Sequence, residues 1–307
     1  MKHRRSRRLT RYPSVFAWNC LLIGWVLTLI TLGAVLGIWA SRTKQWTVQE
    51  ELPKEAEATN PVTSSPLFVS TIAFPSTETL RKSEPTILIY HTHTTEAYCP
   101  TEQNSYETSG DYRTKDQTKN VVAVGEALKQ CLEEQYGFTV LHDTTDHEPP
   151  QLSTAYERSE QTMNTYREAY PSLVLFIDLH RDAYNVTDEP TTDFVSVYQE
   201  EAARLMFVVG KGEKYDEKPY FESNLVLATL ITDHLNSIHE EWMRPIRIKS
   251  GRYNQHIAPH CLLVEVGHNA NTLEQALAAV PYLAEGIAFA FSMQEASLLP
   301  LSLDTVE

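Results

Sequence analysis

Between residues 85 and 297, short apolar runs of strand length alternate with segments of helical periodicity, and this alternation is what most limits the possible folds. The apolar runs cover residues 87–90, 138–141, 173–177 and 261–266. Helical patterns lie between them, at residues 118–136, 153–170 and 224–238. Strands that alternate with helices are typical of an α/β domain with its sheet covered on both faces. We therefore predict a central, mostly parallel sheet flanked by helices on both faces.

Three further features complete the expected layout of this domain. Residues 193–198 and 204–210 are predicted to form a strand pair joined by a short polar turn. Asn271, followed three residues later by Glu274, has the pattern of a capping box that opens the last helix. Pro281 is expected to split that helix, because proline removes a backbone hydrogen bond.

The first forty residues contain no Asp or Glu and have the composition of a membrane anchor. A basic tail (1–14) precedes an uncharged run at residues 15–40. As a helix this run would be roughly 39 Å long, enough to cross a hydrocarbon core of about 30 Å. Trp18 and Trp39 stand near its ends, where aromatic rings meet lipid headgroups. We predict one transmembrane helix over 15–40, with the tail in the cytoplasm and the remaining chain outside the cell membrane.

A cleaved signal peptide is the alternative reading of the same segment. Its apolar region is shorter, about 7–15 residues, and it ends at a small-x-small cleavage site. The end of this run, Ile38 to Ser41, fits such a site poorly. An uncleaved anchor is therefore favoured.

Beyond the anchor, residues 41–84 are rich in Glu, Thr, Ser and Pro and are predicted to be a polar tether. The globular domain is predicted at 85–297, followed by a short tail at 298–307. Six of the 26 Lys and Arg residues lie in the cytoplasmic tail, which leaves 20 against 40 Asp and Glu. A domain this acidic is a poor nucleic-acid binder, because phosphate neutralisation needs clustered cations.

Cysteine usage points to neither a disulfide framework nor a Cys-x-x-Cys metal site. Cys20 lies in the predicted anchor, and Cys99, Cys131 and Cys261 are widely spaced in the rest of the chain. We expect these three to be small buried hydrophobic residues with one bridge at most.

Three of the apolar runs lead directly into ionisable residues. Tyr90 is followed by His91 and His93, the run ending at Ile177 by Asp178-Leu-His180, and Val264 by Glu265. If these strands are parallel neighbours, their carboxyl ends bring two His side chains and a carboxylate to one edge of the sheet, where ligands bind in such folds.

This set of side chains suits a catalytic zinc ion. Zinc in hydrolases takes three protein ligands from His, Asp or Glu and leaves a fourth position for water. The metal lowers the pKa of that water, and a nearby carboxylate accepts its proton. The chain has no Gly-x-Ser-x-Gly motif, so a serine nucleophile is the weaker hypothesis.

Four blocks in order, "ILIYHTHTTEAY", "DYRTKDQTKNVVAVGEALKQCLEEQYGFTVLHD", "FIDLHRDA" and "LLVEVGHNANTLEQA", resemble the stage II sporulation protein P family. The resemblance covers roughly residues 84–295. Members of that family are membrane-anchored cell-wall hydrolases related to zinc-dependent N-acetylmuramoyl-L-alanine amidases.

The resemblance implies roles for particular residues. It makes His93 the first zinc ligand, with His91 as a contender because both lie on one side of a strand. His180 is the second His ligand and Glu265 the catalytic carboxylate. The acidic ligand stays open: counting back from Asn120 gives Asp116, and Glu96 is the alternative.

Three further residues are candidates for substrate contact or for support of the ligands. Arg181 is expected to hold carboxylates of the substrate, and Asp182 to orient a ligand His; a mutual salt bridge between them is the alternative. His268, three residues after Glu265, is expected either to donate a proton or to be an exposed loop residue.

The resemblance also implies the reaction and its setting. The expected reaction is cleavage of the amide between muramic acid and L-alanine in peptidoglycan, with cleavage of peptide cross-links left open. The expected setting is forespore engulfment, with stage II sporulation proteins D and M as partners. The alternative from another class is a membrane-tethered peptidoglycan-binding or scaffold protein with a degenerate site.

Overall fold

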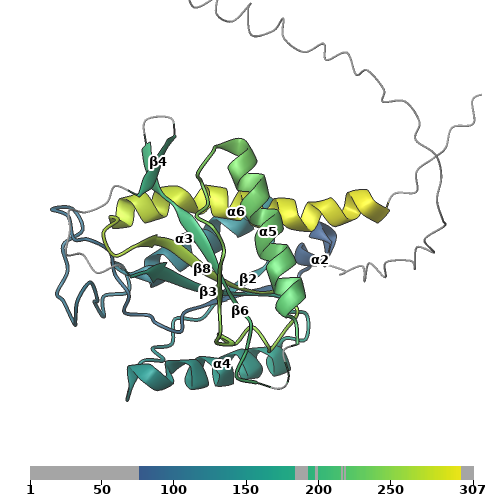
Figure 1. The fold of residues 1–307 in the computed structure, drawn as a ribbon, viewed down its shortest axis with the longest axis horizontal. Helices are drawn as coiled ribbons and strands as arrows, with labels where there is room; N and C mark the ends of the chain where they lie inside the picture. The colour runs from purple at the N-terminus through teal and green to yellow at the C-terminus, as the bar shows by residue number, and fades with distance from the viewer. Residues whose placement is uncertain (1–75, 184–192, 198–199, 216, 218, 299–307) are drawn as a thin grey trace, which may run out of the picture. The chain divides into compact units, whose positions relative to one another are not determined.

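The computed structural model describes residues 76–183, 193–197, 200–215, 217 and 219–298, and the side chains of α6 up to residue 292. The predicted cytoplasmic tail and transmembrane helix lie outside these residues, as do the tether up to residue 75 and the C-terminal tail from residue 299. Between the described ends the chain forms a mixed α/β domain with a central sheet flanked by helices (Figure 1).

A six-stranded sheet forms the centre of the domain, in the order β2-β1-β3-β8-β6-β7. β1 (Ile87–Tyr90) pairs in parallel with both β2 (Val140–His142) and β3 (Leu175–Asp182), and β3 pairs in parallel with β8 (Cys261–His268). β6 (Leu205–Gly210) runs antiparallel to β8, and the short β7 (Arg247–Lys249) runs parallel to β6. The sheet is therefore mostly parallel, and the carboxyl ends of β1, β3 and β8 lie at the same edge.

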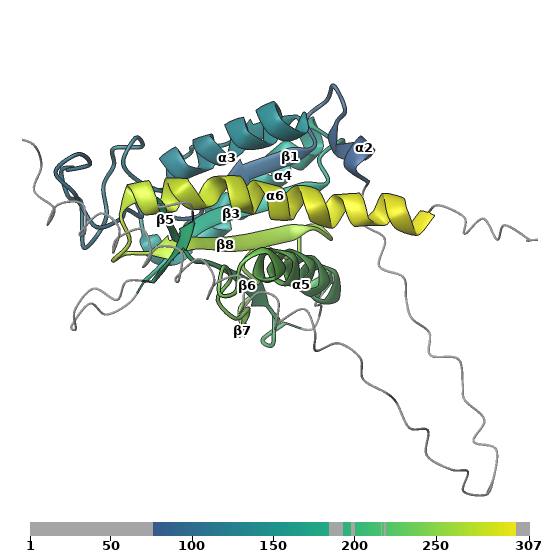
Figure 2. The same ribbon diagram turned by 90° about the horizontal axis from the view of Figure 1, so that it is seen from above.

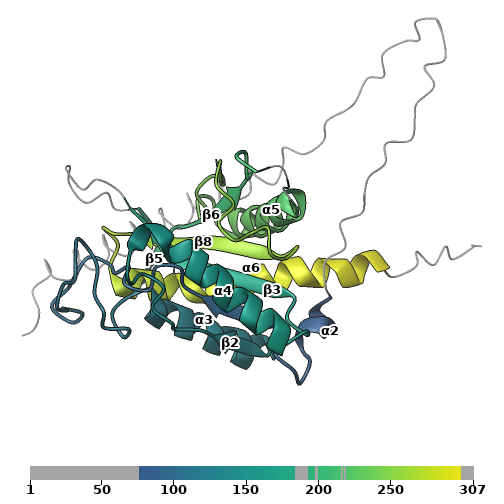
Figure 3. The same ribbon diagram turned by 90° about the horizontal axis from the view of Figure 1, so that it is seen from below.

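Helices cover both faces of the sheet, as the sequence predicts. α3 (Val121–Tyr136), α5 (Phe221–Ile238) and α6 (Leu273–Leu298) pack on one face, and α4 (Ala155–Ala169) lies alone on the other (Figures 2 and 3). The alternation of side chains along each strand explains the two layers. Ile87 and Ile89 of β1 belong to the large core under α3 and α6, whereas Leu88 and Tyr90 belong to the smaller core with Met163 of α4.

α3 shows how local sequence sets the helix ends. Asn120 caps its first turn by accepting a hydrogen bond from the backbone of Val122 at 2.9 Å. Gly137 ends it in the left-handed conformation, with φ of 68°, which glycine adopts at little cost. The three described cysteines, Cys99, Cys131 and Cys261, are all free thiols.

The predicted pairing of residues 193–198 with 204–210 is wrong. β4 (Phe194–Val197) pairs with β5 (Glu200–Ala203) in a separate two-stranded sheet, and β6 pairs with β8 instead. β6 is buried along its whole length, which fits an interior position in the main sheet better than a hairpin arm. The short separation of the two segments in the sequence suggested a hairpin and gave no sign that β6 pairs with β8.

The start and course of α6 also differ from the prediction. Thr272, not Asn271, caps the helix: its hydroxyl accepts from Gln275 N, and Gln275 Oε1 accepts from Thr272 N at 3.1 Å. The reciprocal pair is a capping box shifted by one residue. The helix continues through Pro281, because its apolar side is buried against the sheet, α3 and α5.

Within the described residues, one stretch of α6, Leu273–Ser292, is long and apolar enough to cross a membrane by length and composition. More than half of an 18-residue window within that stretch, 56%, is buried inside the protein, as expected for the central helix of a core. Its apolar composition is explained by packing against α3 and α5.

The last part of the predicted tether is ordered on the domain. α2 (Thr77–Leu80) buries Leu80 completely, and the Leu80 carbonyl accepts a hydrogen bond from Thr86 Oγ1 at 2.8 Å. Thr86 immediately precedes β1, so α2 lies at the amino end of the strands. The described chain therefore enters the domain at the end opposite to the carboxyl edge of β1, β3 and β8.

His260 precedes β8 and is only 5% exposed, and burial lowers its pKa to about 4. Unfolded His titrates near 6.5, so the unfolded chain binds more protons as the pH falls from about 6.5 towards 4. The free energy of unfolding should therefore fall as the pH drops from about 6.5 towards 4, and at pH 5 the loss should be about 2 kcal/mol. We expect urea titrations at pH 7.5 and 5 to show a loss that is about 2 kcal/mol smaller in His260→Gln than in the parent, because other buried histidines such as His91, whose pKa burial lowers to about 3, still contribute.

The exposed His239 provides the matched control for that experiment. A His239→Gln chain should keep the pH dependence of the parent. The same pH dependence in His260→Gln as in the parent would contradict the assignment to His260.

Candidate metal and hydrolytic site

The carboxyl edge of β1, β3 and β8 gathers the ionisable residues that follow these strands. The three strands are adjacent and parallel, as expected from the sequence. Tyr90 is the register partner of Asp178, and His180 that of Glu265. His180 and Glu265 therefore lie side by side on neighbouring strands, on the face of the sheet that also carries α4.

Asp178 fixes the turn that follows β1. Its Oδ1 accepts from the backbone N–H of Thr92 at 2.8 Å, and its Oδ2 accepts from the Thr92 hydroxyl at 2.7 Å. Both residues are buried. Because Thr92 stands directly before His93, these two bonds set where the chain leaves β1, and with it the positions of His93 and Glu96.

His180 lies between two carboxylates. Its Nδ1 is 3.2 Å from Glu96 Oε2, and its Nε2 is 2.8 Å from Asp178 Oδ1. The second contact is an ion pair without hydrogen-bond geometry. Burial disfavours a charge on His180, but Asp178 and Glu96 outweigh it and raise its pKa well above the usual value. The side chain is thus a buried cation between two anions.

Glu96 contacts the end of β3 through both main chain and side chains. Its Oε2 also accepts from the backbone N–H of Arg181 at 3.2 Å, and its Oε1 lies 3.7 Å from Arg113. Burial opposes ionisation, but His180 and Arg181 outweigh it, and the pKa of Glu96 falls to about 2. Glu96 is therefore an ionised carboxylate at neutral pH.

His93 completes the group. Its ring lies 5.4 Å from that of His180 and 5.7 Å from that of Tyr156, both in edge-to-face orientation. The buried Nδ1 has no hydrogen-bond partner among the described residues, since Glu148 Oε1 is 3.9 Å away. Burial lowers the pKa of His93, which favours the neutral imidazole that metals require.

Glu265 is the remaining carboxylate of the cluster. Burial raises its pKa to about 8, while the nearby His180 opposes the rise. Its Oε2 is buried and has no hydrogen-bond partner in the described part of the chain. A partly buried carboxyl group with one buried, unpartnered oxygen and a raised pKa is suited to accept and return a proton.

The donor set of this edge fits zinc in its chemistry. His93, Glu96 and His180 offer two imidazoles and one carboxylate, a ligand set found in catalytic zinc sites. The unpartnered Nδ1 of His93 is a donor that the protein itself does not use. Within the described residues, no three such side chains are already spaced to hold a metal, and His180 makes ion pairs with Asp178 and Glu96.

His91 does not face this cluster. Its Nδ1 donates to the Leu179 carbonyl at 2.8 Å, and its Nε2 lies 2.9 Å from Nε2 of His142. Gly125 of α3 covers the pair so closely that a Cβ there would lie 2.7 Å from His91 Nε2. Because the chain turns after Tyr90, His91 and His93 do not share one side as they would in a continuing strand.

The structure places Asp116 outside the cluster. Its carboxylate is exposed and accepts two hydrogen bonds from Thr118, at 3.0 and 2.7 Å. Glu96 occupies the position beside His180 that the sequence left open between these two carboxylates. His268 is fully buried; its Nδ1 accepts from Ala270 N at 3.1 Å and its Nε2 lies 3.9 Å from Asp193.

Arg181 and Asp182 do not pair through their side chains. The buried guanidinium of Arg181 donates to the carbonyls of Ala97 and Tyr112, at 2.8 and 2.9 Å, so it braces the loop after Glu96. Asp182 forms ion pairs with Arg244 and Arg247 and does not orient a ligand His. The aspartate that contacts a predicted His ligand is Asp178, which lies 2.8 Å from His180 Nε2.

Sequence reasoning missed several residues of the cluster. Asp178 is two positions before His180 on β3, and alternation along a strand puts both on one face, so this signal was present. Glu148 and Tyr156 come from the segment before α4 and from its first turn. No pattern in the sequence links them to His93, because the contact depends on how α4 is placed.

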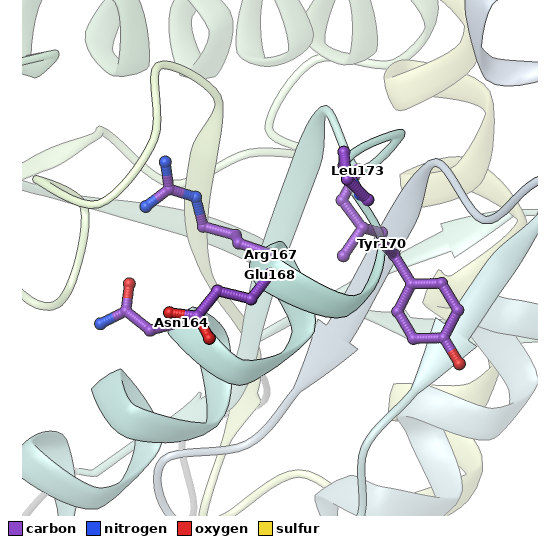
Figure 4. A pocket seen from close by; sticks show the side chains of 6 residues that line it. Asn164, Arg167, Glu168, Tyr170 and Leu173 are labelled. Carbon is purple, nitrogen blue, oxygen red and sulfur yellow. The ribbon is translucent and has the colours of Figure 1, made fainter.

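A separate pocket of about 420 Å³ lies at the other end of α4 (Figure 4). Asn164, Arg167, Glu168 and Tyr170 line it together with Pro171 and Leu173. Tyr156, which touches His93, is in the first turn of the same helix, so the helix length separates this pocket from the cluster.

A family model described as Stage II sporulation protein P (SpoIIP) matches residues 40–288. The Stage II sporulation protein P of Bacillus subtilis (strain 168) is 29% identical over 199 residues, which cover 62% of this chain and 47% of the relative. The chain therefore spans about half the length of the curated relative that it matches.

Two solved structures show a distant likeness. The N-acetylmuramoyl-L-alanine amidase from Clostridium difficile 630 has a TM-score of 0.40 at 16% identity, with 71% of this chain and 100% of that chain covered. The N-acetylmuramyl-L-alanine amidase Ami1 from Mycobacterium abscessus has a TM-score of 0.39 at 13% identity, with 69% and 99% covered. Likeness at this level assigns no activity to this chain.

The contacts of Arg181 predict a structural role that can be measured. In Arg181→Lys the ammonium group cannot reach both carbonyls in the same planar geometry, which leaves buried acceptors unpaired. We expect the free energy of unfolding to fall by about 2 kcal/mol in urea titrations. Arg167→Lys, at an exposed position, is the control. An equally small change in the free energy of unfolding in both variants would show that Arg181 does not stabilise the loop.

Proposed function

Because the chain belongs to the stage II sporulation protein P family, we propose that it is a zinc-dependent peptidoglycan hydrolase. The proposed reaction cleaves the amide between the lactyl group of muramic acid and L-alanine. The observation that carries the proposal is Glu265, a partly buried side chain whose buried Oε2 has no hydrogen-bond partner among the described residues, beside His180 on the next strand. A scaffold or binding module has no use for such a group, because leaving it unpaired costs stability.

The residues that would hold zinc are His93, Glu96 and His180. When bound there, zinc would polarise the scissile carbonyl and acidify a water molecule. Asp178 holds the turn that carries His93 and contacts His180, so it orients two of the three donors. Support of this kind, beyond the direct ligands, is what fixes metal-ligand geometry in proteins.

Glu265 would act as the general base and then as the general acid. Its carboxylate accepts the proton of the attacking water and returns it to the amide nitrogen, so that the amine can leave. The burial that raises its pKa makes the protonated form accessible near neutral pH, as the second step requires. Tyr156 lies against His93 and helps to exclude bulk water from this edge.

The proposed location follows from the N-terminal sequence and from the start of the domain. The basic tail and the apolar run at 15–40 support a single-span anchor with the catalytic domain outside the cell membrane. The described chain enters at the amino end of the strands, which leaves the carboxyl edge facing away from the entry point. A role in engulfment with stage II sporulation proteins D and M stays a prediction from the family.

Replacing the general base tests the proposed reaction. Glu265→Gln keeps the shape of the side chain but cannot accept a proton, so release of stem peptides from purified sacculi should fall about a thousandfold. Stem peptides released by the full-length chain with zinc are measured by mass spectrometry. Glu168→Gln, on the far end of α4, should match the parent; equal activity of Glu265→Gln would refute the role of Glu265.

Metal content tests the ligand assignment separately from activity. His93→Ala, Glu96→Gln and His180→Ala should each lose the zinc that the parent retains after dialysis, about one ion per chain. Asp116→Asn should retain it, because its carboxylate lies away from the cluster. Zinc lost by Asp116→Asn and kept by Glu96→Gln would reverse the choice between the two carboxylates.

A further inference from the structure

A second charged cluster lies beside Glu265, on the side of the sheet away from β1. Asp182 Oδ2 is 3.0 Å from Arg244 Nη1 and 3.2 Å from Arg247 Nη1, so one carboxylate oxygen serves two guanidinium groups. Asp193 pairs with Arg204 at 3.1 Å and lies 3.8 Å from Arg244 Nε. Among the described residues, three cations face two anions here, in a strongly acidic chain.

The position of Arg247 in the sheet places this cluster near the catalytic edge. Arg247 begins β7, and Asp182 ends β3; β6 and β8 lie between these two strands. At about 4.8 Å between neighbours, β7 and β3 are roughly 14 Å apart. The Arg247–Asp182 pair therefore bridges the two intervening strands, one of which carries Glu265.

Electrostatics agree with this placement. Burial is the main cause that raises the pKa of Glu265, and Asp182 and Arg244 are among the charged neighbours that modify it. Asp182 also has His268 as its register partner on β8, three residues after Glu265. Asp182 and Arg244 of this cluster are thus within electrostatic reach of the proposed general base.

Arg247 differs from the other arginines of this edge in its accessibility. Its side chain is 41% exposed, against 7% for Arg244. Its guanidinium carries five N–H donors, and within the described residues its one partner is Asp182, through Nη1. Arg113 and Arg181 are committed elsewhere, to Glu148 at 2.7 Å and to backbone carbonyls.

We propose that Arg247, held over the sheet by Asp182, binds a carboxylate of the stem peptide on the leaving side of the scissile amide. This inference rests on the proposed function, since the peptide is the substrate of that reaction. A planar guanidinium with unused donors binds carboxylates in a bidentate manner, which gives direction as well as charge. The subsite would select peptides with a free carboxylate near the cleaved bond over amidated ones.

The test compares two muramoyl peptides that differ in one group. One carries a free carboxylate on the second residue of the peptide, and the other a carboxamide at the same place. With the full-length, zinc-loaded chain we expect kcat/KM to be about tenfold higher for the acid. Arg247→Gln should remove this preference by raising KM for the acid, and Arg247→Lys should keep part of it.

Lys249→Gln is the matched control, because it removes one exposed positive charge from the same strand. It should keep the preference of the parent. An unchanged preference in Arg247→Gln, or the same loss in Lys249→Gln, would overturn the proposal.

A binding measurement separates failure of this inference from failure of the proposed function. Calorimetric titration with the free acidic stem peptide needs no catalysis, and its Kd should rise about tenfold in Arg247→Gln. If the parent cleaves neither substrate, but the Kd is about tenfold higher in Arg247→Gln than in the parent, the subsite stands and the amidase reaction does not. Equal Kd in the parent and Arg247→Gln overturns the subsite, whatever the activity.

Discussion

The carboxylate of Asp178 is the group on which the whole candidate site depends. It accepts two hydrogen bonds from Thr92 and lies 2.8 Å from His180, so a single buried side chain joins the end of β1 to β3. Burial alone would raise its pKa, but His180 and Thr92 outweigh this and lower it. Without this ionised group the turn after β1 would lose the bonds that hold it against the sheet.

The fold class and the location of the site were predictable from the sequence, because both follow from short-range patterns. Apolar runs and helical spacing identify the strands and helices, and parallel strands place their carboxyl ends at one edge. That rule brings His91, His93, His180 and Glu265 to one edge, and the family resemblance favours His93 over His91. Asp178 was also within reach, because it alternates with His180 on one strand.

Choices that depend on three-dimensional contacts were not predictable in this way. Residues 204–210 pair with β8 and not with the hairpin, since burial on both faces decides their partner. Asp116 and Glu96 are both acidic residues near the first helix, and only the course of the turn puts Glu96 against His180. Arg181 was predicted to bind substrate, but its guanidinium donates to the backbone carbonyls of Ala97 and Tyr112.

Charge at this edge is arranged from one side of the sheet to the other. The end of β1 supplies His93 and Glu96, β3 supplies Asp178 and His180, and β8 supplies Glu265. Beyond β8 lies the arginine cluster around Asp182. On the proposed function, this order separates metal binding, proton transfer and recognition of the peptide into neighbouring strands.

Anomalous diffraction at the zinc edge from crystals of the zinc-loaded chain tests the central claim most directly. The account predicts one strong peak within about 2.0–2.2 Å of His93, Glu96 and His180, with a further position open towards Glu265. A zinc peak held by Asp116 or by His91 and His142, or no peak at this edge, would contradict it.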